Sequence, residues 1–122
     1  MKVLSLKQPF AELVVSGKKK IELRKWNTKF RGEFLIHASQ TPDKKEMERF
    51  GFSHLPLGCI VGKVILKEVK KYTTPEHFLE DQDKHLASQE WGTYGFILID
   101  AQRLPQVAVK GKLGFWDYPI ED

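Results

Sequence analysis

Hydrophobic and polar positions along the chain predict both strands and short helices. Runs of β-branched and aromatic residues between polar, glycine or proline clusters are typical of strands. Apolar residues at i, i+3 and i+4 are typical of a helical face. These patterns predict strands at residues 1–6, 21–26, 33–39, 59–72, 94–100 and 107–110. They predict helices at residues 9–16, 44–50, 74–79 and 83–90.

Local breakers refine this outline. Gly62 lies inside the longest apolar run and predicts a β-bulge there. Pro105 has no backbone N–H, so we expect residues 104–105 to end one strand before the next begins. The aromatic tail, residues 112–119, is expected to pack back onto the body. Five or six strands with short helices between them predict a mixed α+β domain, most simply a small β-barrel flanked by helices.

Length and composition narrow the class of protein. A chain of 122 residues fits one domain, which we expect to span residues 1–122. The net charge of +4 permits a nucleic-acid or phosphate partner. The single cysteine, Cys59, excludes an intrachain disulfide and is expected to be an inert core thiol. No apolar run is long enough to span a membrane and no signal-peptide pattern is present, so we expect a soluble, cytoplasmic protein without a membrane partner.

The sequence contains no pattern that predicts a metal or a cofactor. The four histidines show no close pairing, and one cysteine cannot supply zinc-finger spacing. A phosphate-binding glycine loop, a nucleophile elbow and a dinucleotide fingerprint are all missing. We therefore expect neither a metal nor a cofactor.

The segment from Gly17 to Arg24 concentrates charge between a helix and a strand. Gly17 is a suitable helix end, and strand alternation places Glu22 and Arg24 on one face. Lys19 joins that face only if the chain is still turning after Gly17. A carboxylate among cations suits holding a polar ligand or orienting a lysine for chemistry. The alternative is a solvated basic strand whose ion pairs contribute little.

Other candidate residues lie further along the chain. His37 and Ser39 share one side at the end of a predicted strand, where site residues are common. Trp26, beside the basic strand, is placed either to stack on a base or to fill the core. Glu90 is a second carboxylate candidate, although an acid near a helix end often has no role.

Four short elements together resemble a known family, the ASCH (activating signal cointegrator homology) domain of the PUA-like superfamily. They are Ser5-Leu6-Lys7-Gln8-Pro9-Phe10, Gly17-x-Lys19-x-x-Glu22-x-Arg24, Trp26-x-Thr28-x-Phe30-Arg31-Gly32 and Leu35-Ile36-His37-Ala38-Ser39. The second element is the signature of that family, and the resemblance covers nearly the whole chain. It implies a PUA-like barrel.

The resemblance also implies a ligand. PUA-like domains typically bind RNA, and ASCH domains are thought to offer a cleft beside the first helix to RNA or a nucleotide-like molecule. Lys19, Glu22 and Arg24 would line this cleft. Together with the residues selected above, the predicted RNA- or nucleotide-binding set is Ser5, Lys7, Gln8, Gly17, Lys19, Glu22, Arg24, Trp26, His37 and Ser39.

An enzymatic alternative follows from the same resemblance. Some small bacterial relatives remove the acetyl group from acetylated cytidine with the motif lysine, a threonine three residues later and a downstream glutamate. Here Lys19 is kept, Glu22 occupies the threonine position, and Glu90 is the best downstream acid. Other relatives are described as ribonucleases. Because a neighbouring carboxylate raises the pKa of a lysine, binding is preferred to catalysis by Lys19, Glu22 and Glu90.

Overall fold

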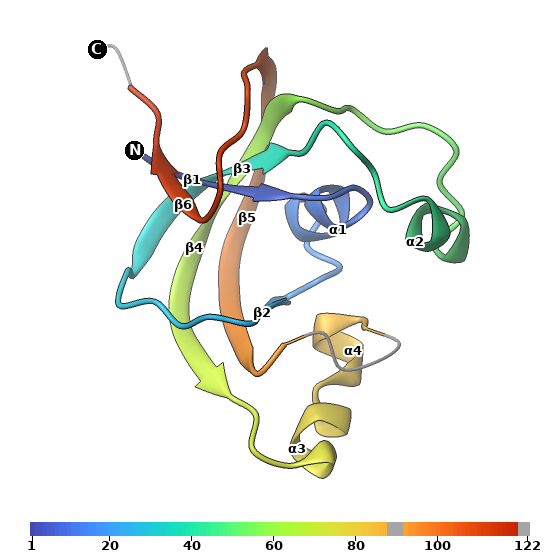
Figure 1. The fold of residues 1–122 in the computed structure, drawn as a ribbon, viewed down its shortest axis with the longest axis vertical. Coiled ribbons are helices and arrows are strands. Elements are labelled where there is room, and N and C mark those ends of the chain that lie inside the picture. Colours follow the sequence, from blue (N-terminus) through green and yellow to red (C-terminus); the bar gives the residue numbers. More distant parts are fainter. Residues whose placement is uncertain (88–91, 120–122) are drawn as a thin grey trace.

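Six strands form one mixed sheet in the computed structural model, which describes residues 1–87 and 92–119 (Figure 1). The strands are β1 (Lys2–Leu6), β2 (Ile21–Arg24), β3 (Gly32–Ala38), β4 (Cys59–Lys71), β5 (Tyr94–Ala108) and β6 (Phe115–Asp117). The helices are α1 (Phe10–Val15), α2 (Lys44–Arg49), α3 (Pro75–Glu80) and α4 (Gln82–His85). The predicted α+β class is confirmed.

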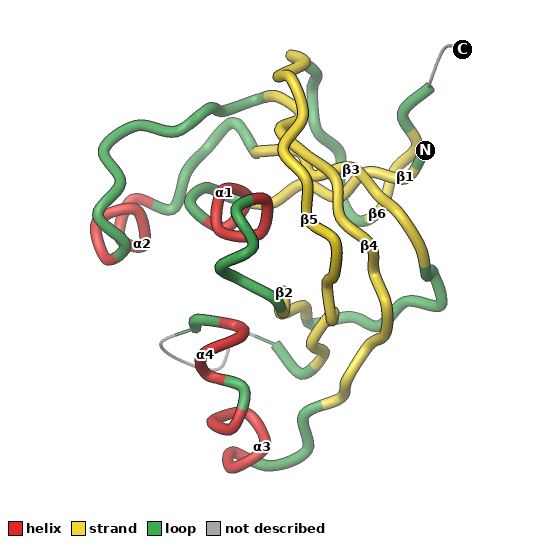
Figure 2. Tube along the Cα trace, turned by 180° about the vertical axis from the view of Figure 1, so that it is seen from behind, coloured by secondary structure: helices red, strands yellow, loops and turns green. Residues whose placement is uncertain are grey.

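The sheet has the strand order β2-β5-β4-β3-β1-β6. Strands β1 and β3 run parallel, and the other neighbouring strands are antiparallel. The long strands β4 and β5 curve along the molecule, as seen from both sides (Figures 1 and 2). Strands β2 and β6 lie at opposite ends of the strand order. In the described part of the chain the sheet is therefore curved like a PUA-like barrel but not closed.

Strand β5 is longer than the sequence pattern predicts. The expected break at residues 104–105 is wrong, since β5 runs without interruption to Ala108. Residues 104–106 lie at a register shift opposite Val61 of β4, and β2 pairs only with residues 94–97. The missing N–H of Pro105 therefore falls at an irregular, one-sided part of the ladder, where proline is tolerated.

The predicted irregularity at Gly62 is confirmed. The pairing of β4 with β5 shifts register between Ile60 and Gly62, and the pairing of β3 with β4 shifts between Ile36 and His37 at the same level. A Cβ on Gly62 would approach the backbone oxygen of Gln102 to 2.6 Å, so a larger residue would push β5 away. The shift brings β3 to its end beside β1, where His37 faces Ser5.

Helix α1 packs on the sheet and forms the main core. Its apolar positions Ala11, Val14 and Val15 are buried against side chains from β1, β3, β4 and β5. The i, i+3, i+4 pattern of the sequence thus corresponds to a buried stripe. A smaller apolar cluster joins β2 to helix α3 and to the segment after α4 through Ile21, Leu23, Tyr72, Phe78 and Ala87.

Two further predictions concern the second half of the chain. The aromatic tail packs back as expected, and its strand β6 pairs with β1. The predicted helix at residues 83–90 is wrong in its extent, because α4 ends at His85 and Leu86 adopts the left-handed conformation with φ +59°. Residues 88–91, which include the candidate Glu90, lie outside the described residues.

Candidate nucleotide-binding cleft

A turn after helix α1 brings Lys19 to the same side as Glu22. Gly17 has a φ of +81°, a conformation that suits glycine, and its N–H donates to the carbonyl of Val14. The N–H of Lys19 donates to the carbonyl of Leu13 at 2.8 Å, so the chain is still turning at this residue. The Nζ atom of Lys19 then lies 3.7 Å from Oε1 of Glu22. The geometric condition for a shared face is therefore met.

The side chain of Lys19 is buried rather than directed into solvent. Its exposed fraction is 0%, and its Nζ donates to the backbone carbonyl of His85 while lying 5.5 Å from the centre of the Phe10 ring. Burial lowers the pKa of Lys19, and the nearby Glu22 carboxylate opposes that shift. Lys19 thus links helix α4 to the Glu22 carboxylate from behind.

Glu22 is held by a cation on each oxygen. Lys19 approaches Oε1, and Nη2 of Arg24 lies 3.3 Å from Oε2. The same Nη2 donates to the backbone carbonyl of Ser5 at 3.0 Å, which ties β2 to β1. Among the described residues, the buried Nε of Arg24 has no hydrogen-bond partner. A buried donor without a partner costs free energy. Such groups are often kept at functional sites, where they hold a side chain in place for a ligand.

Ser5 and His37 form a second polar pair on neighbouring strands. The Nε2 atom of His37 lies 2.7 Å from the carbonyl of Val109, so this nitrogen must carry the proton and donate it. The other nitrogen, Nδ1, lies 2.9 Å from the hydroxyl of Ser5, within hydrogen-bond distance. The indole N–H of Trp116 points to the same hydroxyl at 3.4 Å. These contacts fix the orientation of the His37 ring and attach the segment after β5 to the sheet.

One cleft of about 820 Å³ brings these two polar groups together. Its volume is typical of a site for a small organic ligand. Four cationic side chains and one carboxylate are among its lining residues, which gives it an excess of positive charge. Its lining is Ser5, Lys7, Phe10, Glu22, Leu23, Arg24, His37, Ser39, Gln40, Gly58 and Lys110 to Gly114.

The loop from Lys110 to Gly114 forms a wall of the cleft that the sequence interpretation missed. Gly111 lies so close to the sheet that a Cβ there would be 2.6 Å from Cε1 of His37 and 2.8 Å from Oγ of Ser5. Lys110 and Lys112 are exposed, and Leu113 is 99% exposed. Two lysines alternating with glycines were the available signal, since glycines mark loops and clustered lysines mark anion sites.

Other predicted site residues do not line the cleft. Gln8 is buried, accepts from the N–H of Glu12 and donates to the carbonyl of Pro56, so it supports the start of α1. Trp26 packs edge-on against Phe96, with their ring centres 5.4 Å apart. Lys7 and Ser39 do line the cleft.

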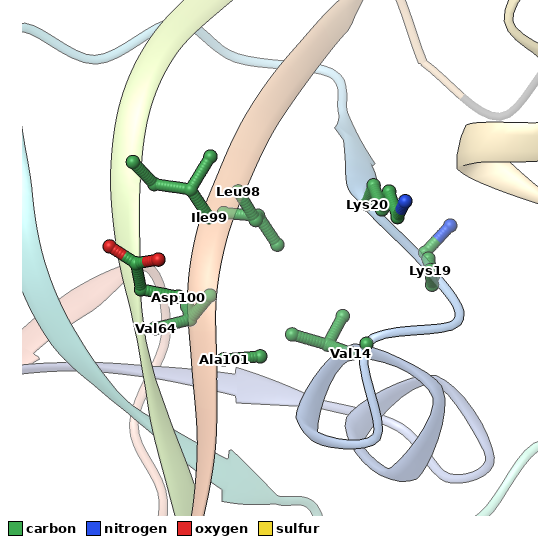
Figure 3. A pocket seen from close by; sticks show the side chains of 9 residues that line it. Val14, Lys19, Lys20, Val64, Leu98, Ile99, Asp100 and Ala101 are labelled. Carbon is green, nitrogen blue, oxygen red and sulfur yellow. The ribbon is translucent and has the colours of Figure 1, made fainter.

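A smaller hollow of about 330 Å³ lies on the other side of the motif, between α1 and β5 (Figure 3). Gly17 and Lys19 are among its lining residues. In Figure 3 the side chain of Val14 points towards β5, whereas Lys19 and Lys20 extend away from it. The lining of the hollow is mainly apolar. The amine of Lys19 instead contacts Glu22 and the carbonyl of His85.

The described residues include neither a metal-binding group nor a membrane-spanning helix. Within residues 1–87 and 92–119, no group of three or more histidine, cysteine, aspartate or glutamate side chains is arranged to hold a metal ion. No helix in the same ranges is long and apolar enough to cross a membrane. Cys59 is buried, and burial raises the pKa of its thiol, which suits a core residue.

Comparison with known families decides the relationship of this chain. The family model of the ASCH domain matches residues 4–104. The chain belongs to the ASCH domain family. This PUA-like family is associated with RNA binding. A search of curated proteins found no match.

Solved ASCH structures share the fold. The crystal structure of ASCH from Zymomonas mobilis is 19% identical in sequence, with a TM-score of 0.64, and the match covers 88% of this chain and 72% of that one. Two single-residue variants of the same protein give TM-scores of 0.66 and 0.67 at the same identity. They cover 88% of this chain and 74% and 73% of theirs. In this ASCH chain, the family motif contributes Glu22 and Arg24 to the cleft and buries Lys19 behind them.

Proposed function

We propose that this chain, acting as a single ASCH domain, binds RNA or a nucleotide in the cleft between β1, β2 and the loop after β5. The observation that carries the proposal is the charge of the lining. Lys7, Arg24, Lys110 and Lys112 line one cleft, whereas its single carboxylate, Glu22, is already paired with cations. A surface of this kind attracts phosphates and releases their counterions.

The test compares two pairs of lysines in a titration with fluorescently labelled single-stranded RNA. Replacing Lys110 and Lys112 by alanine removes two exposed cations from the cleft. Replacing Lys44 and Lys45 by alanine removes the same charge from helix α2, which does not contribute to the lining. Fluorescence anisotropy over a salt series then separates a local contact from a general effect of net charge.

We expect binding to weaken as salt rises and the cleft variant to bind less tightly. If each lysine neutralises one phosphate, the slope of log K against log salt falls by about 1.4, at ~0.7 per contact on a single strand. The α2 variant should keep the wild-type slope. An affinity that does not change with salt concentration, or an equal loss of affinity in both variants, would contradict the proposal.

The geometry gives less support to the hydrolase alternative. A catalytic lysine must reach the substrate, but the side chain of Lys19 has no exposed surface and does not line the cleft. Its amine is engaged by Glu22 and the carbonyl of His85. Its lowered pKa would suit a general base. A general base must first lie within reach of the substrate, however, and only then does its pKa matter. Binding is therefore preferred.

A further inference from the structure

Charge is not evenly distributed over the cleft. The carboxylate of Glu22 belongs to a side chain only 12% exposed, and Phe10, which is also buried, lines the same cleft. The lysines Lys7, Lys110 and Lys112 are exposed. A phosphate is repelled by the inner carboxylate and attracted to the outer cations. A nucleotide therefore fits with its base inside, near Glu22, and its phosphate at the lysines.

Glu22 is fixed as a pure hydrogen-bond acceptor. Lys19 and Arg24 approach different oxygens of its carboxylate, at 3.7 Å and 3.3 Å. A carboxylate is an acceptor only, and a cation at each of its oxygens prevents free rotation of the group. An ionised carboxylate has about four acceptor positions. With one used by each cation, roughly two remain for a ligand.

Arg24 adds donors beside this acceptor. Its guanidinium can only donate, and its side chain is 22% exposed in the same cleft. The inner end of the cleft thus presents two acceptor positions followed by a donor. Guanine alone among the four RNA bases presents two adjacent donors, N1–H and the 2-amino group, followed by the acceptor O6 on its Watson–Crick edge.

We propose that the cleft selects guanine, with Glu22 accepting from N1–H and the 2-amino group and Arg24 donating to O6. This inference rests on the proposed nucleotide-binding function and assigns its base specificity. Single-stranded or free nucleotides are the suitable ligands, because this edge of guanine is occupied in a duplex. The lysines at the opening hold the phosphate without regard to the base.

Inosine provides the sharpest test because it differs from guanosine only by the missing 2-amino group. Binding of GMP and IMP is measured by calorimetry, and the same pair is compared at the centre of a five-nucleotide RNA that is otherwise adenine. The series is completed with adenine, cytosine and uracil at the same position. We expect guanine to bind about tenfold more tightly than hypoxanthine, the scale of one hydrogen bond to a charged group.

A matched pair of variants assigns this preference to Glu22. Glu22→Gln replaces one acceptor oxygen by an amide donor and should reduce the ratio of GMP to IMP affinity severalfold. Glu33→Gln makes the same change on β3, where Glu33 pairs with Lys63 at 3.4 Å and does not line the cleft. Its affinity ratio should remain that of the wild type.

The outcomes separate the two proposals. Equal binding of all the bases, or a preference for another base, overturns guanine selection and leaves nucleotide binding in place. Failure of every mononucleotide and every RNA to bind overturns both. The comparison of bases uses the wild-type protein alone. It therefore tests the inference even if Glu22→Gln folds poorly.

Discussion

Lys19 shows how a single residue of the motif acts from behind the cleft. Its amine has no exposed surface and is held by Glu22 and the carbonyl of His85. A charge this deeply buried is tolerated only with partners, and its removal leaves an uncompensated group. The motif lysine of this chain therefore fixes Glu22 in place and joins β2 to α4.

Lys19→Ala should lower the free energy of unfolding by about 3 kcal/mol, because it breaks a buried pair and leaves a cavity. Arg24 still contacts Glu22, which keeps the loss from being larger. Urea denaturation at neutral pH measures the change. Lys20→Ala is the control, since Lys20 is exposed, and it should stay within about 0.5 kcal/mol. Equal stability of the two variants would show that the Lys19 pair contributes little.

At the scale of elements, the short helix α4 depends on one neutral histidine. The Nε2 atom of His85 lies 2.7 Å from the carbonyl of Phe78 and donates to it, while Nδ1 accepts from the N–H of Ala87 at 3.1 Å. Burial lowers the pKa of His85, and Lys19 adds to this effect, whereas the Phe78 carbonyl, Asp81 and Asp83 oppose it. Protonation would remove the acceptor for Ala87.

Stability should therefore fall as the pH drops below about 6.5, the ordinary pKa of histidine. Above that value neither the folded nor the unfolded chain carries the proton. Below it the unfolded chain takes up a proton that folded His85 resists, so unfolding is favoured by at most ~1.4 kcal/mol per pH unit. Urea midpoints at pH 7.5 and 5.5 measure the fall.

The control for this effect is His77 on helix α3, which is exposed. His77→Ala should keep the wild-type pH dependence, whereas His85→Gln should flatten it between pH 7.5 and 5.5. An unchanged dependence in His85→Gln would assign the fall to other groups. Asp81 contributes at lower pH. Burial alone would raise its pKa, but hydrogen bonds from Lys70 and Tyr72 lower it, so its contribution is lost only in acid.

The sequence predicts elements well where local chemistry decides and less well where neighbours decide. Gly17 ends α1 and Gly62 marks a bulge because glycine acts locally. Pro105 does not end β5, since within the described residues no strand pairs with the outer side of β5 at this position. The extent of α4 depends on Leu86, whose left-handed conformation no sequence pattern indicates.

At the scale of the whole molecule, the cleft too is predictable only where local sequence decides and not where distant elements do. Glu22, Arg24, His37 and Ser5, which the sequence marks as candidates, line this one cleft. The lysines and glycines of residues 110–114 indicate a basic loop, but its place in the cleft could not be predicted, because it depends on a hydrogen bond from His37 to Val109 across 72 positions of the chain. The burial of Lys19 likewise depends on α4, which lies 66 residues later.

The two ends of the chain complete the sheet together. Strand β6 pairs with β1, and the N-terminal amine of Met1 donates to the carbonyl of Tyr118 at 2.9 Å (Figure 1). Trp116 of β6 is 7% exposed and packs with Val3, Leu35 and Ile60. Folding of β1 and of the cleft loop is therefore expected to require this C-terminal strand.

Trp116→Ala tests this dependence on the whole fold. Loss of a buried tryptophan should lower the free energy of unfolding by about 3–5 kcal/mol, a large part of the ~5–15 kcal/mol that is typical of a protein. Nucleotide affinity should fall with it, because the indole contacts Ser5 and β6 follows the cleft loop. Leu113→Ala, on the same loop but 99% exposed, should leave the free energy of unfolding within about 0.5 kcal/mol. A loss below 1 kcal/mol for Trp116→Ala in urea denaturation would mean that the packing of β6 is dispensable for β1 and the cleft.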